Sequence, residues 1–447
     1  MITLGCAENI VDVPLFAELG GYGPFLGRRN LGVRDPLYCR VLTVNDGTRR
    51  NVIVVTDTIS SNEKFCRVLR MELASDFAIY PESIMFMGTH THSAAGTASC
   101  DVGYGEPSAE FLDNWRRMVR KSLQEAIANE EEVSAFAGCA PLLRQLGTCR
   151  TAGKDQHTDP FIRFVKFVRN DGSVKALLHN HAMHGVVFGA QKMVSGDWMG
   201  AVNAKIKAAK MADIPVYLYG TSGDVNVIWT DEDEKAVSIE QWVTLNDKAR
   251  ERNLEWISSS YVESLNAALD SAEEISLGPC RAALKTFEFP TEPVIAEEYR
   301  DIAEKLLAKL PSPFETLLRY THDRMLEMAV LAERGHDFRV LRDLQVLRMG
   351  DLEIMAVPGE PFLAVGEALR ENAKVKFPLA VSVANGDAGY YPTREMFEQY
   401  PSIFCCDDFG AFGFYEVWFG AGLHRPKFKS GIVEFIVQNL LDMEKGL

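Results

Sequence analysis

Several short apolar runs of this chain end directly in a cluster of polar residues, and this arrangement constrains the possible fold more than any other feature. Apolar runs of five or six residues are typical of buried strands. In open α/β sheets the loops that follow the strands converge at one edge, where ligands bind. We therefore expect the five clusters to share one pocket. The runs are 83–88, 174–178, 215–219, 352–357 and 379–384, and the clusters begin at Thr89, His179, Gly220, Pro358 and Asn385.

Other segments predict the elements that surround these strands. Residues 37–44 and 52–56 are rich in β-forming residues and flank Asn45-Asp46-Gly47, a typical hairpin turn. Apolar residues recur at helical spacing over 108–129. We predict an α/β fold with a mixed β-sheet core flanked by helices, formed by a single catalytic domain over residues 1–447. Charged, helical insertions are expected at about 230–275 and about 295–335.

The charge balance excludes some classes of partner. Lys and Arg number 47 and Asp and Glu number 62, which gives a net charge of −15. Such a chain repels phosphate backbones and anionic lipids, so we expect no nucleic-acid partner. No apolar run reaches the ~18 residues of a transmembrane helix, and the first 13 residues lack the basic start of a signal peptide. The nine cysteines are scattered without CxxC spacing, which favours free thiols in the cytoplasm.

The histidines give the sharpest chemical signal. His90 and His92 stand two residues apart, and on an extended strand both would point to the same side. Imidazole is a good ligand for Zn²⁺, although such a pair by itself is equally consistent with two hydrogen-bonded histidines. A second group contains His179, His181 and His184. Because five of the nine histidines lie in these two groups, a metal site is the favoured interpretation.

Zinc sites often add a carboxylate to two histidines and leave one position open. Glu360, in the turn Pro358-Gly359-Glu360, is the candidate. The alternative for Glu360 is a helix N-terminal acid that interacts with the helix dipole after Pro361. The glycines of Gly20-Gly21-Tyr22-Gly23 follow no predicted strand, so we do not expect a dinucleotide site there.

Seven short segments carry a family resemblance, and they occur in the family's order over nearly the whole chain. They are 32–38 (GVRDPLY), 87–93 (MGTHTHS), 182–185 (AMHG), 222–226 (SGDVN), 357–360 (VPGE), 385–390 (NGDAGY) and 415–417 (YEV). Together they resemble the catalytic domain of the neutral/alkaline, non-lysosomal ceramidase family.

The resemblance implies a zinc-dependent hydrolase that cleaves a C–N amide bond with metal-activated water. The substrate would be a small molecule or a lipid amide. His92 would stand beside the metal and support a ligand or carry a proton, and Tyr415 would line the site. The implied zinc ligands are His90, His184, Glu360 and Tyr390.

The chain also departs from the family. Asn226 stands where the family carries a serine, so we count it among the catalytic residues with His92, Tyr390 and Tyr415, but without a nucleophilic role. We expect no C-terminal immunoglobulin-like domain of the kind found in secreted ceramidases. The alternatives are a zinc hydrolase of a small polar ester or metabolite, and a non-catalytic, metal-dependent binding protein. The oligomeric state stays open.

Overall fold

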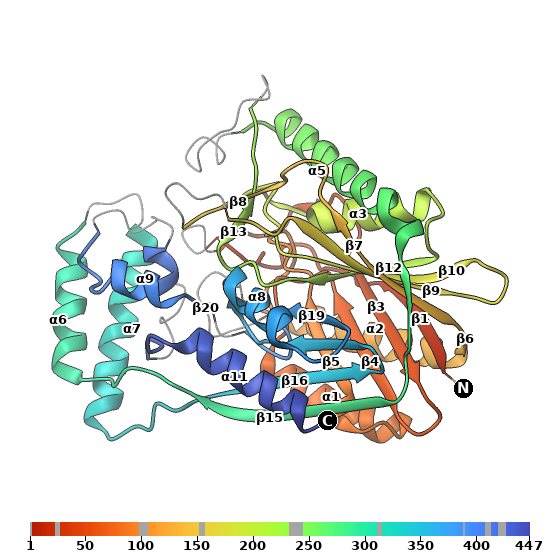
Figure 1. Cartoon of the computed structure of the whole chain (residues 1–447). Helices are drawn as coiled ribbons and strands as arrows, with labels where there is room; N and C mark the ends of the chain where they lie inside the picture. The colour runs from red at the N-terminus through yellow and green to blue at the C-terminus, as the bar shows by residue number, and fades with distance from the viewer. Residues whose placement is uncertain are drawn as a thin grey trace.

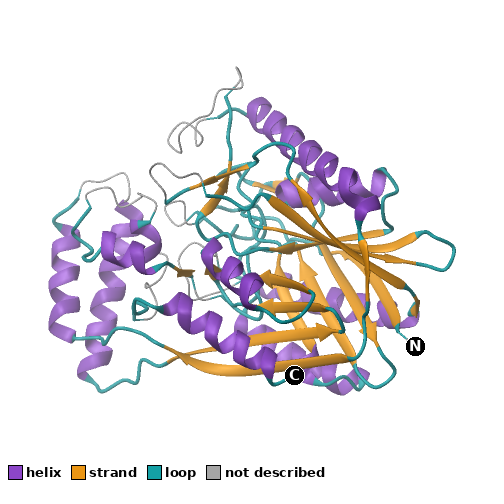
Figure 2. Ribbon diagram, in the orientation of Figure 1, coloured by secondary structure: helices purple, strands orange, loops and turns teal. Residues whose placement is uncertain are grey.

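The molecule is built around two β-sheets that stack face to face, with helices on their outer faces (Figures 1 and 2). The structure is a computed structural model, and it describes residues 2–22, 27–97, 106–151, 157–231, 245–310, 315–387, 389–406, 413–418 and 426–447.

The first sheet is mixed and has the order β5-β4-β3-β1-β6. Its outer face is covered by two helices, and alternation along β4 shows why. Val52 and Val54 pack toward these helices, whereas Ile53 and Val55 face the second sheet. The strands are β1 (Thr3–Ile10), β3 (Tyr38–Asn45), β4 (Arg50–Thr56), β5 (Ile84–Gly88) and β6 (Glu131–Glu132), and the helices are α1 (Glu63–Phe77) and α2 (Ala109–Ala128).

The second sheet has the order β12-β10-β9-β7-β14 and is antiparallel except for the pair β10 and β12. Phe164 and Leu177 are fully buried in the core that both sheets share. The strands are β7 (Ser134–Pro141), β9 (Phe161–Val168), β10 (Val174–His181), β12 (Ile214–Tyr219) and β14 (Glu273–Ile275). The helices α3 (Asp197–Ala208) and α5 (Asp247–Ala268) pack on this sheet.

A third sheet, of order β15-β16-β17-β19, extends the core and is covered by two helices. The strands are β15 (Cys280–Phe289), β16 (Val340–Met349), β17 (Leu352–Ala356) and β19 (Phe377–Val381), and the helices are α8 (Leu363–Asn372) and α11 (Ile432–Lys445). Three short strand pairs close the loops between the sheets. They are β2 (Gly32–Val33) with β11 (Met193–Val194), β8 (Gly147–Cys149) with β13 (Val225–Val227), and β18 (Glu360–Pro361) with β20 (Tyr390–Tyr391).

A helical pair projects from the side of the sheets, on the left of Figure 1. It consists of α6 (Ala296–Leu307) and α7 (Glu315–Glu333), and the short helices α9 (Arg394–Gln399) and α10 (Phe414–Trp418) lie between this pair and the third sheet. Among the described residues, no helix combines the length and the apolar character needed to cross a bilayer.

The predicted fold class is confirmed: mixed sheets form the core and helices flank them. The predicted strand at 161–168 and the helix at 108–129 match β9 and α2 closely, and Ser108 caps α2 by accepting from the Phe111 amide. Two expectations were wrong in detail. The strand predicted at 174–178 continues to His181, because β10 pairs with β12 as far as Tyr219. The strand predicted at 379–384 ends at Val381, after which Val383 takes a left-handed conformation. Residues 232–244 of the first predicted insertion lie outside the described residues.

Candidate metal centre

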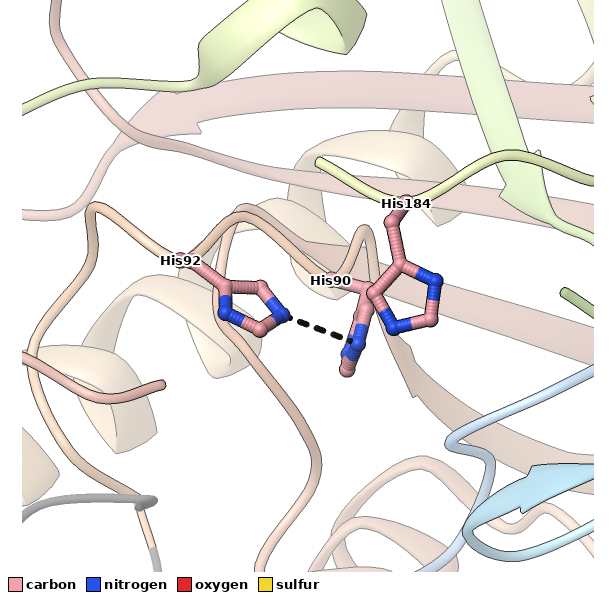
Figure 3. Close-up of side chains that lie close together, drawn as sticks. All are labelled: His90, His92 and His184. Carbon is pink, nitrogen blue, oxygen red and sulfur yellow. Dashed lines mark hydrogen bonds between the residues drawn. The ribbon is translucent and has the colours of Figure 1, made fainter. Parts of the chain in front are cut away.

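Three buried histidines meet in the loops that follow β5 and β10 (Figure 3). His90 and His92 come from the loop after β5, and His184 comes from the loop after β10. One ring nitrogen from each lies within 4.8 Å of the others. The Nε2 atoms of His90 and His92 are 3.1 Å apart. Strand ends distant in the sequence therefore bring imidazoles to one point, as the pattern of polar clusters predicts.

The prediction that His90 and His92 lie on one extended strand was wrong. β5 ends at Gly88, and His90 takes a left-handed conformation with φ of +64°. Thr91 then forms an isolated parallel bridge with Gly185, and the His92 amide donates to the Gly185 carbonyl oxygen at 3.1 Å. This backbone contact holds the loop of His90 against the loop of His184. A left-handed non-glycine residue costs energy and commonly marks a functional site.

In the glycine-rich segment 20–23, Gly21 has a structural role beside His92. It has a φ of +84°, and a Cβ built on it would lie 2.3 Å from Nδ1 of His92. The neighbouring Tyr22 ring lies 4.8 Å from the His92 ring. Glycine is therefore required here because the backbone passes directly against this histidine.

Hydrogen bonds to backbone carbonyls orient two of the imidazoles. Nδ1 of His90 lies 2.7 Å from the Ile59 carbonyl oxygen, and Nδ1 of His184 lies 3.1 Å from the Val225 carbonyl oxygen. A carbonyl accepts, so each Nδ1 carries the proton. In the neutral ring the Nε2 lone pair then faces the centre of the site. Burial lowers the pKa of His184 to about 4, although the hydrogen bond with Glu360 opposes this shift.

Glu360 supplies a carboxylate to the same point. Its Oε2 lies 3.2 Å from Nε2 of His90 and 3.0 Å from Nε2 of His184. Gly359, with φ of +79°, turns the chain into β18, so Glu360 precedes α8 by three residues and is not its N-terminal acid. Burial raises the pKa of Glu360, but attraction to His90 and the hydrogen bond with His184 outweigh burial. The pKa therefore lies well below its usual range.

Tyr390 is the direct neighbour of Glu360, because β18 and β20 pair in parallel with these two residues in register. Its hydroxyl accepts from Nη2 of Arg150 at 3.5 Å. Burial raises the pKa of Tyr390 well above its usual value, so the side chain is a neutral phenol here. The Tyr415 ring lies 6.2 Å from the Tyr390 ring in an edge-to-face arrangement, which places Tyr415 at the rim of the cluster. Of the segment 385–390, Ala388 lies outside the described residues.

Arg150 is the main site residue that sequence reasoning missed. Its Nη1 lies 3.3 Å from Nε2 of His184 and donates to Oδ1 of Asn226 at 3.4 Å. Arg150 follows β8, which pairs with the strand that carries Asn226. A single arginine after a three-residue strand gives no motif, so only this pairing reveals its place. Tyr219 was also missed: its ring stacks on His90 at 4.6 Å, and its position at the end of β12 was the available signal.

His179 and His181 do not join the site. Both lie within β10 and are buried against α3 and α5. Nδ1 of His179 lies 3.0 Å from the Tyr261 hydroxyl, and its Nε2 donates to Oδ1 of Asn203 at 2.8 Å. Grouping them with His184 was wrong, because the strand continues through His181 and only the following loop turns into the site.

The donor set suits a small divalent cation. Nε2 of His90 and Nε2 of His184 lie 3.2 and 3.0 Å from Oε2 of Glu360, distances at which these atoms can share a proton or a bound metal ion. Imidazoles whose second nitrogen is bonded to a carbonyl are typical of zinc ligands. The buried group of His90, His92 and His184 could therefore hold a metal ion.

Comparison with known structures identifies the fold. The chain superposes on a structure described as neutral ceramidase from Pseudomonas aeruginosa with a TM-score of 0.73, at 16% sequence identity, over 100% of this chain and 75% of that one. This chain has a ceramidase-like fold. A structure described as ceramidase complexed with C2 gives a TM-score of 0.74 at 16% identity, over 99% of this chain and 74% of that one. No protein-family model and no curated protein sequence matches the chain.

Proposed function

We propose that this chain is a zinc-dependent hydrolase that cleaves a C–N amide bond. The observation that carries the proposal is the convergence of His90, His184 and Glu360 on one buried point. The ceramidase-like fold supports the same reaction class, because the structures that share it are described as ceramidases. We propose that the whole chain, residues 1–447, acts as one catalytic unit and works in the cytoplasm.

We propose that His90, His184 and Glu360 hold the metal and that Tyr390 completes the ligand set. His90 and His184 face Glu360 directly. Nε2 of His92 instead contacts Nε2 of His90. A zinc ion in this position would supply a Lewis acid that polarises a carbonyl and acidifies water.

The surrounding side chains supply the remaining parts of an amide hydrolysis. Arg150 and the Tyr390 phenol are hydrogen-bond donors at the edge of the cluster, where they can stabilise negative charge on an amide oxygen. His92 is the candidate to carry a proton to the leaving amine, because its Nε2 lies 3.1 Å from Nε2 of His90 at the edge of the cluster. Tyr415 closes the side of the site next to Tyr390.

Asn226 lies inside this arrangement and accepts a hydrogen bond from Arg150. A carboxamide is not a nucleophile, so attack on the amide carbon has to come from water. We propose that Asn226 orients Arg150 and the substrate amide.

The proposal is tested with purified wild-type protein and a panel of N-acyl amides of short and long acyl chains. We expect turnover of at least one amide that a chelator abolishes and added zinc restores. His90→Ala is expected to lose both zinc and turnover, and Glu434→Gln, in an exposed ion pair with Arg394, is expected to keep both. Chelator-resistant turnover, or zinc retained in full by His90→Ala, would overturn the proposal.

The second candidate is a metal-dependent binding protein, which Asn226 favours because it replaces the nucleophilic side chain of the resembling family. Zinc-dependent binding of a carboxylate product without turnover of any amide or ester would support it. Turnover of esters of small polar molecules, with no amide cleaved, would instead favour the polar ester or metabolite as substrate.

A further inference from the structure

Glu416 holds the arginine that enters the candidate metal centre. Its Oε1 accepts from Nη2 of Arg150, and both side chains are buried, with exposed fractions of 0% for Glu416 and 6% for Arg150. The other oxygen, Oε2, accepts from the backbone amide of Gly413. Both carboxylate oxygens are therefore bonded, and the geometry of the pair is fixed from two sides.

The short helix α10, which carries Glu416, is itself anchored on two sides. Phe414 is fully buried in the core of the helical pair, beside Leu317 and Leu318 of α7. Val417 is buried in the core of the third sheet. The Trp418 indole donates to the Tyr400 carbonyl oxygen at 2.9 Å. The helical pair α6 and α7 thus supports the wall from which Glu416 reaches the site.

The charge of Arg150 explains why a carboxylate is needed beside it. The guanidinium is a permanent cation, and its Nη1 lies 3.3 Å from Nε2 of His184, the nitrogen that also faces Glu360. In a dry pocket two neighbouring cations repel strongly. An unpaired arginine here would compete with a metal ion for the lone pair of His184 and for the carboxylate of Glu360.

We propose that Glu416 is a positioning residue that neutralises Arg150 and holds its guanidinium beside the histidine cluster, so that the cluster can accept a divalent cation. This inference rests on the proposed zinc-dependent function. Glu416 acts through Arg150 and contributes no ligand of its own. The rival explanation is that Glu416 only anchors α10 through the Gly413 amide.

A double-mutant cycle on the full-length chain separates the two explanations. The variants are Glu416→Gln, Arg150→Met and the combination of both, with Glu434→Gln as the matched control because Glu434 pairs with Arg394 at the exposed surface. Zinc affinity is measured by competition with a chromophoric chelator. The stability of the metal-free chain is measured by urea unfolding.

We expect Glu416→Gln to weaken zinc binding by about 10- to 100-fold, the usual loss when a partner of a ligating residue is removed. It should also lower the urea midpoint of the metal-free chain, since it removes the carboxylate that is bonded to a buried guanidinium. The double variant should recover most of both losses, because the charge that Glu416 balances is gone. Glu434→Gln should match wild type in both assays.

Zinc affinity unchanged in Glu416→Gln would overturn the inference, as would a double variant as weak as or weaker than Glu416→Gln. Absence of zinc binding by wild type would instead refute the proposed function. The stability cycle of the metal-free chain would still decide whether Glu416 balances Arg150.

Discussion

The buried histidines form two groups whose contacts differ in kind. His179 and His181 sit within β10, and each ring finds an ordinary hydrogen-bond partner: Tyr261 and Asn203 for His179, and the Phe161 carbonyl for His181. His90 and His184 instead direct Nε2 at an ionised carboxylate. The first group has separate protein partners, whereas the two imidazoles of the second group share one carboxylate, as the proposed metal site requires. Burial does not distinguish the two groups, and neither does a nearby carboxylate, because Nδ1 of His181 lies 3.8 Å from Asp159. The difference is that Nε2 of both His90 and His184 converges on one carboxylate.

The largest expected effect comes from replacing one histidine of each group by alanine. His184→Ala should abolish zinc binding while the metal-free chain keeps most of its stability. His179→Ala should keep zinc binding but lose about 2–4 kcal/mol of stability, since it opens a cavity and leaves the Tyr261 and Asn203 groups unpaired. Zinc content and urea unfolding of both variants provide the measurement. Equal losses of zinc in the two variants would remove the distinction.

Glu360→Gln tests whether the charge of the shared carboxylate is needed for zinc binding. The amide keeps the shape but not the charge, so zinc affinity should fall by more than about 100-fold, beyond the loss typical of an outer partner. The circular dichroism spectrum should stay unchanged. Full zinc affinity in Glu360→Gln would show that the two imidazoles suffice.

Tyr390→Phe tests the next neighbour of the cluster. Loss of the hydroxyl should lower kcat by about 10- to 1000-fold, the range for removing one donor to a developing negative charge. Stability should change little. The measurement is steady-state hydrolysis, at saturating zinc, of the amide identified in the substrate panel, and zinc affinity is recorded as well because Tyr390 is also a proposed ligand. Unaltered kcat would exclude Tyr390 from the reaction.

The smallest expected effect concerns a second buried glutamate, Glu353, whose pKa is shifted in the opposite direction from that of Glu360. Glu353, on β17, pairs with Arg348, which also pairs with the α11 residue Glu444. Burial raises the pKa of Glu353 from 4.5 to about 7, although Arg348 opposes the shift. A raised carboxyl pKa stabilises the fold below pH 4.5, and this contribution is lost as the pH rises through 7.

Glu353→Gln should therefore be more stable than wild type at pH 8, by roughly 1–3 kcal/mol. The two proteins should unfold alike near pH 4.5, where the wild-type carboxyl is protonated. Urea unfolding across this pH range provides the measurement. A variant that is less stable at pH 8 would show that the ion pair with Arg348 outweighs burial.

The sequence contained much of the fold because its strands are short apolar runs with clear ends. β9 and α2 could be located to within a residue or two. The rule that polar clusters follow strand ends also brought His90, His184 and Glu360 into one expected pocket. These predictions depend on local patterns, which the sequence displays directly.

The rest depends on tertiary pairing that leaves no local signal. Arg150 reaches the site only because β8 pairs with β13, and Glu416 only because α10 is packed between the helical pair and the third sheet. The extended i, i+2 arrangement expected for His90 and His92 is instead found at His179 and His181, where β10 continues. Spacing alone could not tell which pair lies on a strand.

The central claim is that one divalent cation sits between the imidazoles and the carboxylate. Anomalous diffraction from crystals of the zinc-loaded protein, recorded on both sides of the zinc absorption edge, tests it most directly. The account predicts one strong peak about 2.0–2.2 Å from Nε2 of His90, Nε2 of His184 and a carboxylate oxygen of Glu360. No peak between these atoms, or zinc bound only elsewhere on the protein, would contradict the account.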